Sequence, residues 1–137
     1  MSTLELHLRI AGVTMLLLAA AHPSFARHFQ WRAETRKFDL LTRQVFWVHL
    51  LFICLLLVLQ GVLLAFFPRT LLARTELAQL VAGGLAIFWI ARLIAQWLIY
   101  DQALWRGNRF HTVMHLLFSM LWMYYALVFS IACWRQM

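Results

Sequence analysis

The chain has 137 residues, of which 64% are hydrophobic and 12% are charged, and its formal net charge is +7. Soluble domains are roughly 45–50% apolar and about 25% charged, and a domain this small cannot hide so much apolar surface from water. The composition therefore excludes a soluble domain and indicates an integral membrane protein. Because the basic residues are scattered through hydrophobic sequence, they favour loops facing anionic headgroups over a nucleic-acid surface.

The first apolar segment is the shortest of four. Residues 10–21 are purely apolar, and the run ends in Ala19-Ala20-Ala21, which is also typical of a signal-peptide cleavage region. Leucines at alternate positions before Ile10 lengthen the segment to a membrane span. We therefore expect a transmembrane helix over residues 3–22.

The next segment, residues 23–44, is basic and aromatic. It holds five basic residues against two acidic ones: Arg27, Arg32, Arg36, Lys37 and Arg43 against Glu34 and Asp39. Phenylalanine and tryptophan side chains are interleaved with these charges. This mixture predicts an interfacial loop that lies in the headgroup region.

Three longer apolar runs follow, over residues 45–67, 77–100 and 110–134. Each exceeds the roughly 20 residues that a helix needs to cross about 30 Å of hydrocarbon. Short connections between them require neighbouring helices to be antiparallel, and Gly83-Gly84 is expected to permit close helix packing. The sequence thus predicts an all-α fold, a polytopic antiparallel bundle of four transmembrane helices forming one domain over residues 1–137.

Loop charges predict the orientation of this bundle. The face that carries the first and third loops has seven basic residues, and the opposite face has four. The positive-inside rule places the richer face in the cytoplasm, with both termini outside and a bacterial inner membrane as the expected location. An aromatic belt is expected at that face, formed by Trp47, Trp97, Tyr100 and Trp105.

Four histidines from three helices are predicted to meet near the cytoplasmic face. They are His22, His49, His111 and His115. His111 and His115 are one helical turn apart, which is the spacing that lets two imidazoles bind one metal ion. Arg92 lies inside the third span, where a charge costs at least about 2.5–3.5 kcal/mol on insertion scales and marks a functional candidate. Gln96 and Tyr100 follow Arg92 on the same helix face, and these polar stripes are expected to converge.

Imidazole side chains in a membrane interior are typical ligands of haem iron and of transition metals. A haem b would use His49 and His115 as axial ligands, with Arg92 on a propionate and Tyr100 beside it. A zinc, copper or iron ion would instead bind His49, His111 and His115, with His22 as a fourth ligand. Either cofactor predicts a redox or electron-transfer protein that can pass electrons to a quinone.

Two other functions stay open. The chain can be a non-catalytic accessory subunit of a larger membrane complex, or a homo-oligomer, with histidines that are merely interfacial. It can also be an enzyme or carrier for an anionic lipid, with Arg92, Arg106, Arg109 and the histidines as phosphate contacts. The sequence contains no catalytic triad, phosphate loop or dinucleotide fingerprint, so it leaves open whether the protein is an enzyme.

Overall fold

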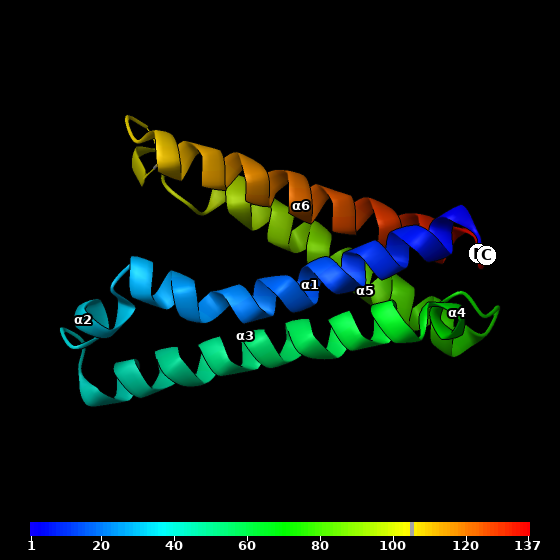
Figure 1. Cartoon of the computed structure of the whole chain (residues 1–137), viewed down its shortest axis with the longest axis horizontal. Coiled ribbons are helices and arrows are strands. Elements are labelled where there is room, and N and C mark those ends of the chain that lie inside the picture. Colours follow the sequence, from blue (N-terminus) through cyan, green and yellow to red (C-terminus); the bar gives the residue numbers. More distant parts are fainter. Residues whose placement is uncertain (105) are drawn as a thin grey trace. The chain divides into compact units, whose positions relative to one another are not determined.

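The computed structural model describes residues 1–104 and 106–137, apart from the side chain of Gln102, and its helices are drawn in Figure 1. Trp105, which the sequence assigned to the aromatic belt, lies outside the described residues. The described elements are α1 (Thr3–His28), α2 (Trp31–Thr35), α3 (Leu40–Phe66), α4 (Pro68–Leu71), α5 (Glu76–Leu98), a 3₁₀ helix η1 (Gln102–Leu104) and α6 (Arg109–Trp134).

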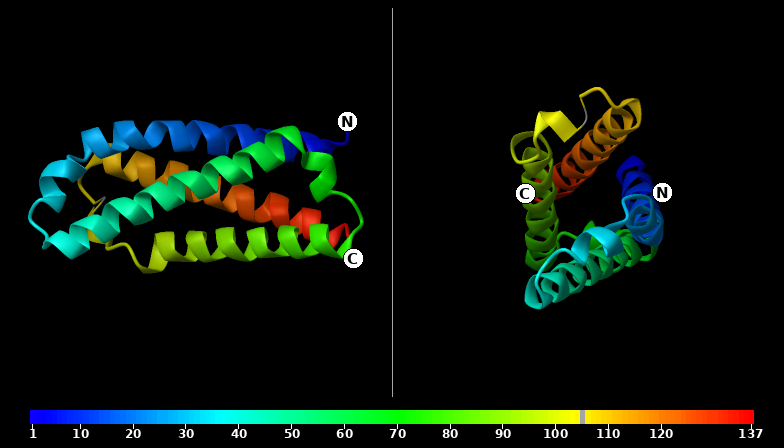
Figure 2. Two further views of the ribbon diagram at one scale, coloured as in Figure 1. Left: turned by 90° about the horizontal axis from the view of Figure 1, so that it is seen from below. Right: turned by 90° about the vertical axis from the view of Figure 1, so that its left-hand side faces the viewer.

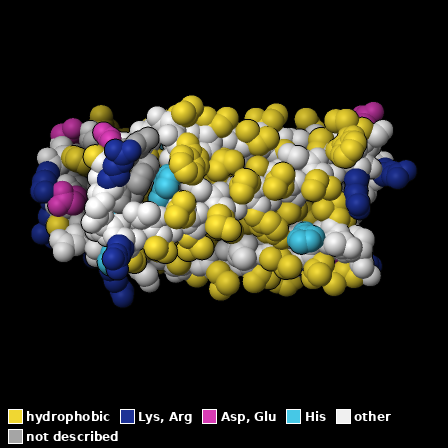
Figure 3. Space-filling model, turned by 90° about the horizontal axis from the view of Figure 1, so that it is seen from above, with side chains coloured by type: hydrophobic (Ala, Val, Ile, Leu, Met, Phe, Trp, Pro, Cys, Tyr) yellow, Lys and Arg dark blue, Asp and Glu magenta, His cyan; other side chains and the backbone are white. Residues whose placement is uncertain are grey.

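Four of these helices, namely α1, α3, α5 and α6, are long and apolar enough to cross a membrane. The prediction of an all-α chain with four such helices is confirmed, and no strand occurs in the described part. On the face shown in Figure 3, hydrophobic side chains form a broad band between regions where Lys and Arg gather. The choice of membrane and the position of the termini relative to the cytoplasm stay predictions.

The sequence encodes the start of each long helix in the same way. A side-chain oxygen just before the helix accepts a hydrogen bond from the backbone N–H three residues later, and the four acceptors are Ser2, Asp39, Thr75 and Asn108. Each cap satisfies one of the N–H groups that a helix start leaves unbonded. This is important in a bilayer, because an unsatisfied backbone group costs several kcal/mol there.

The predicted interfacial loop over residues 23–44 is wrong in extent. Helix α1 continues through Pro23 to His28, α2 occupies part of the connection, and α3 already begins at Leu40. Proline favours a helix end because it lacks an N–H, but membrane helices tolerate it where neighbouring groups satisfy the freed carbonyl. Asp39 caps α3, which begins at Leu40, five residues before the apolar run, so the helix starts earlier than hydropathy indicates.

The contacts divide the chain into two units, Leu6–Pro68 and a second unit that joins Met1–Glu5 to Arg69–Met137. In the Leu6–Pro68 unit, α1 and α3 run antiparallel (Figure 2). Their backbones approach so closely at Gly12 that an added Cβ would lie 2.5 Å from Ala65 N and 2.8 Å from Gly61 O. Arg9 Nη1 donates to Ala65 O at 2.7 Å and so bonds one of the last carbonyls of α3.

In the second unit, α5 and α6 lie side by side in antiparallel directions (Figure 2), over a core that includes stacked Trp89 and Trp122 rings. Both chain ends lie near α4, because Arg69 pairs with the buried Glu5 at 3.2 Å and Gln136 Nε2 donates to Leu71 O at 2.9 Å. The expectation of close packing at Gly83-Gly84 is wrong for Gly84, since nothing lies within 4 Å of an added Cβ there.

Candidate functional site in the α5–α6 unit

Two of the four predicted ligand histidines, His22 and His49, belong to the Leu6–Pro68 unit, which we call the α1–α3 unit. Each Nδ1 lies 2.8 Å from a carbonyl one turn earlier in its own helix, Leu18 O for His22 and Val45 O for His49. A carbonyl can only accept, so Nδ1 carries the proton and the neutral ring keeps its lone pair on Nε2. His22 is half-buried, whereas His49 is exposed.

The other two predicted ligands lie on α6 of the second unit, one turn apart as expected. His111 Nδ1 is 2.9 Å from Leu104 O of η1, and His115 is buried with 6% of its surface exposed. The two rings therefore have different partners. Within the described residues, no group of three or more His, Cys, Asp or Glu side chains is arranged to hold a metal ion.

His115 is joined to Arg92 by a chain of hydrogen bonds, the relay, that crosses from α5 to α6. Arg92 Nη1 donates to Gln96 Oε1 at 3.1 Å, and Gln96 Nε2 lies 2.9 Å from His115 Nδ1. Because arginine has only donors, the amide oxygen of Gln96 must face Arg92 and its NH₂ group must face His115. The amide then donates to Nδ1, so in the neutral ring the proton is on Nε2.

This tautomer decides what His115 can do. A metal ion or haem iron binds the lone pair of a neutral imidazole nitrogen, but here the Nδ1 lone pair accepts from Gln96 and Nε2 carries the proton. In this arrangement His115 can donate a hydrogen bond from Nε2. The ring is fixed further by Trp97, whose centroid lies 4.8 Å away in an edge-on contact.

Two aromatic rings lie against the guanidinium group of Arg92. Its guanidinium carbon lies 5.1 Å from the Trp122 ring centroid and 5.8 Å from that of Tyr100. Such cation–π contacts contribute about 0.5–2 kcal/mol, more when desolvated. No carboxylate in the described structure pairs with this half-buried arginine.

Two buried donors continue the α6 face beyond His115. Ser119, 7% exposed, and Trp122, 6% exposed, have Oγ and Nε1 atoms that meet no hydrogen-bond partner among the described residues. A buried polar group left in this state costs about 1–3 kcal/mol, and native structures usually supply it with a partner. We refer to Arg92, Gln96, His115, Ser119 and Trp122 as the α5–α6 site.

The sequence predicted part of this site. Helical spacing placed Arg92 with Gln96 and Tyr100, and the structure brings these three residues and His115 together. The sequence reasoning missed Trp122, although it lies seven residues after His115 on the same helix face. No known protein family matches the chain, and no characterised protein or solved structure was found to be similar to it.

Proposed function

We propose that the protein binds a membrane-soluble quinone at the α5–α6 site, as part of redox chemistry in the membrane. The observation that carries this proposal is the buried set of donors beside an arginine that has no acid partner. Ser119 Oγ and Trp122 Nε1 are two donors without described partners, 7% and 6% exposed as residues. A quinone offers two carbonyl acceptors, a flat ring that stacks on aromatic side chains, and solubility in the lipid phase.

The depth of the site supports a ligand that arrives through the bilayer. At about 1.5 Å of rise per residue, His115 lies roughly 9 Å, and Trp122 roughly 20 Å, from the start of α6. These depths are within the hydrocarbon layer if the helix crosses a membrane. A water-soluble substrate would have to leave its hydration shell to reach this depth, whereas a quinone head already resides there.

The same groups suit the chemistry of a quinone. Its reduction to quinol takes up two electrons and two protons, with electrons supplied by a partner redox protein. Arg92 stabilises the negative charge that develops on a quinone oxygen, because its positive charge is fixed in place before the reaction. His115 can donate a hydrogen bond from Nε2 to a quinone oxygen, and Gln96 keeps the ring in the tautomer that has this N–H. Both protons of the quinol are taken up from the aqueous phase.

A binding titration with decylubiquinone tests the proposal, using quenching of tryptophan fluorescence in the purified full chain. We expect saturable binding, weakened about two- to tenfold by Ser119→Ala, because one neutral hydrogen bond contributes about 0.5–1.5 kcal/mol. Ser130→Ala removes a half-buried hydroxyl from the same helix and should leave the affinity unchanged. Non-saturable quenching, or equal affinity in wild-type and Ser119→Ala protein, would rule out the proposed site.

A second candidate function is transition-metal or haem binding through the α1–α3 unit. It is favoured by His22 and His49, whose Nδ1–H groups bond carbonyls and so leave the Nε2 lone pairs to bind a metal, as in metal-ligating histidines. Elemental analysis and an optical spectrum of protein purified in mild detergent would test it. We expect zinc, copper, iron or a Soret band that disappears in the double variant His22→Ala/His49→Ala and persists in His28→Ala. Protein free of metal and haem would refute this candidate.

A further inference from the structure

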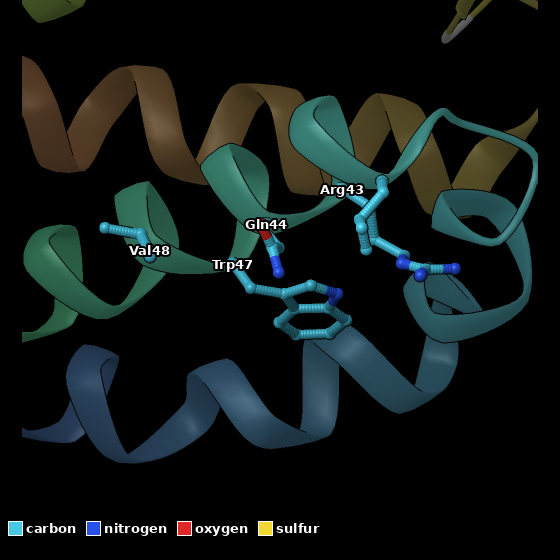
Figure 4. A pocket seen from close by; sticks show the side chains of 5 residues that line it. Arg43, Gln44, Trp47 and Val48 are labelled. Carbon is cyan, nitrogen blue, oxygen red and sulfur yellow. The ribbon is translucent and has the colours of Figure 1, made fainter.

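The connection between the first two long helices forms a basic groove. A cavity of about 330 Å³ is lined by Arg32, Thr35, Arg36, Arg43 and Trp47. We call it the α2–α3 groove. Figure 4 shows Arg43 and Trp47 projecting from the beginning of α3, and both side chains also line an adjoining cavity of about 570 Å³. The groove lies wholly within the Leu6–Pro68 unit.

The helix α2, which carries two of the groove arginines, packs on α3. Gln30 takes a left-handed backbone conformation with φ of 50°, which turns the chain into α2. Thr35 is buried and its hydroxyl donates to Trp31 O at 2.7 Å. The Trp31 ring then contacts Phe46 of α3 edge-on, with centroids 5.9 Å apart. The arginines on these elements are therefore presented by an ordered scaffold.

The nearby acids do not neutralise the groove arginines. Glu34 pairs with Lys37 at 2.6 Å, and Asp39 caps α3 by accepting from Thr42 N at 2.8 Å and Thr42 Oγ at 2.7 Å. The hydrogen bonds from Thr42 hold the pKa of Asp39 below its usual range, so this carboxylate stays charged and engaged in the cap. None of the three guanidinium groups forms an ion pair with a described carboxylate.

The two adjoining cavities differ in the polarity of the residues that line them. The α2–α3 groove is basic, whereas its neighbour adds Leu40, Gln44 and Val48 to the shared Arg43 and Trp47. Val48 is 51% exposed, and it opens onto the exposed apolar side chains of a helix that is apolar enough to cross a membrane. The basic groove and the more apolar cavity therefore adjoin at Trp47. Tryptophan is favoured at a membrane–water boundary.

We propose that the α2–α3 groove binds an anionic phospholipid, with the phosphate among Arg32, Arg36 and Arg43 and an acyl chain along Val48. A guanidinium group can donate two parallel hydrogen bonds to two oxygens of one phosphate. These charge-assisted bonds add to the electrostatic attraction between the two groups. The site differs from the quinone site in unit, residues and ligand, so either can fail without the other. Soluble anions can also carry a phosphate group. We assign the groove to a lipid because the adjoining cavity is lined by the apolar side chains of Leu40 and Val48.

The test measures lipid binding to the purified full chain in detergent by native mass spectrometry, with phosphatidylglycerol and phosphatidylcholine as probes. We expect phosphatidylglycerol to bind at least tenfold more tightly than phosphatidylcholine. The double variant Arg36→Gln/Arg43→Gln should lose this preference. Arg27→Gln/Arg74→Gln removes the same charge from exposed positions outside the groove and should keep it. Arg43→Lys, which keeps the charge but loses the paired geometry, should show an intermediate loss.

Three results would overturn the proposal. Equal binding of the two lipids would mean that the apolar surface alone adsorbs them. Equal loss in the control double variant would mean that net charge, and not the groove, attracts the headgroup. Complete displacement of the lipid by millimolar inorganic phosphate would assign the groove to a soluble anion. Unchanged far-UV circular dichroism in all variants verifies that each retains its helices.

Discussion

Replacing Gly12 by leucine is expected to destabilise the α1–α3 unit by about 3 kcal/mol or more, beyond the usual cost of overpacking a core. An added Cβ would lie 2.5 Å from Ala65 N and 2.8 Å from Gly61 O, and both are backbone atoms that cannot rotate away. The helices must therefore separate. Separation also breaks the bond from Arg9 Nη1 to Ala65 O, which is 2.7 Å long. Unfolding in mixed detergent and sodium dodecyl sulphate, followed by circular dichroism, measures the change.

Gly84 provides the matched control for Gly12. It is also helical, but an added Cβ meets nothing within 4 Å. Gly84→Ala should therefore be neutral or stabilise the protein by up to about 1 kcal/mol through helix propensity alone. If Gly12→Leu unfolds at the same sodium dodecyl sulphate fraction as wild type, the close approach of α1 and α3 is wrong.

Replacing Gln96 by leucine is expected to cost about 2–4 kcal/mol, because it removes both bonds of the relay at once. Arg92 loses its 3.1 Å bond and His115 loses its 2.9 Å bond, while the buried ring stays in an apolar setting. A lost partner costs about 1–3 kcal/mol for a buried group, and more when the group is charged. The same unfolding assay measures this change.

Gln44→Leu removes an exposed amide that makes no side-chain hydrogen bond within the described chain and should change stability by less than about 0.5 kcal/mol. A Gln96→Leu protein as stable as this control would show that the relay is not formed. The quinone titration adds a second readout, since loss of the relay should also weaken decylubiquinone binding.

The four membrane helices were predictable because their signals are local. Three of them contain enough consecutive apolar residues to cross a membrane, and alternate leucines lengthen the first. The helix starts were less predictable, since the Asp39 cap begins α3 before its apolar run. The continuation of α1 beyond Pro23 was not predictable, since it depends on how the surrounding structure satisfies a freed carbonyl. Packing glycines were missed for a related reason. A Cβ added at Gly12 would meet backbone atoms of α3, whereas one added at Gly84 would meet no atom within 4 Å. This difference depends on how the helices are aligned, which the sequence does not show.

The sequence also predicted some features of the candidate site and not others. Spacing along α5 put Arg92 and Gln96 on one face, and topology put His115 at a similar depth on α6. The role of His115 could not follow from these arguments, because it depends on which amide atom of Gln96 faces which neighbour. The ligand set of His22, His49, His111 and His115 stays a prediction, while the relay assigns His115 a donor role. The α2–α3 groove depends on a five-residue helix that hydropathy does not reveal.

The protonation of the His115 ring is the most direct test of this account. Solid-state ¹⁵N NMR of histidine-labelled protein, with the His115 signals assigned by their absence in His115→Gln, distinguishes the two neutral tautomers. We expect the proton on Nε2 and an unprotonated Nδ1 that accepts from the Gln96 amide. A neutral ring with its proton on Nδ1 and a lone pair on Nε2 would contradict the relay and return His115 to the role of a metal or haem ligand.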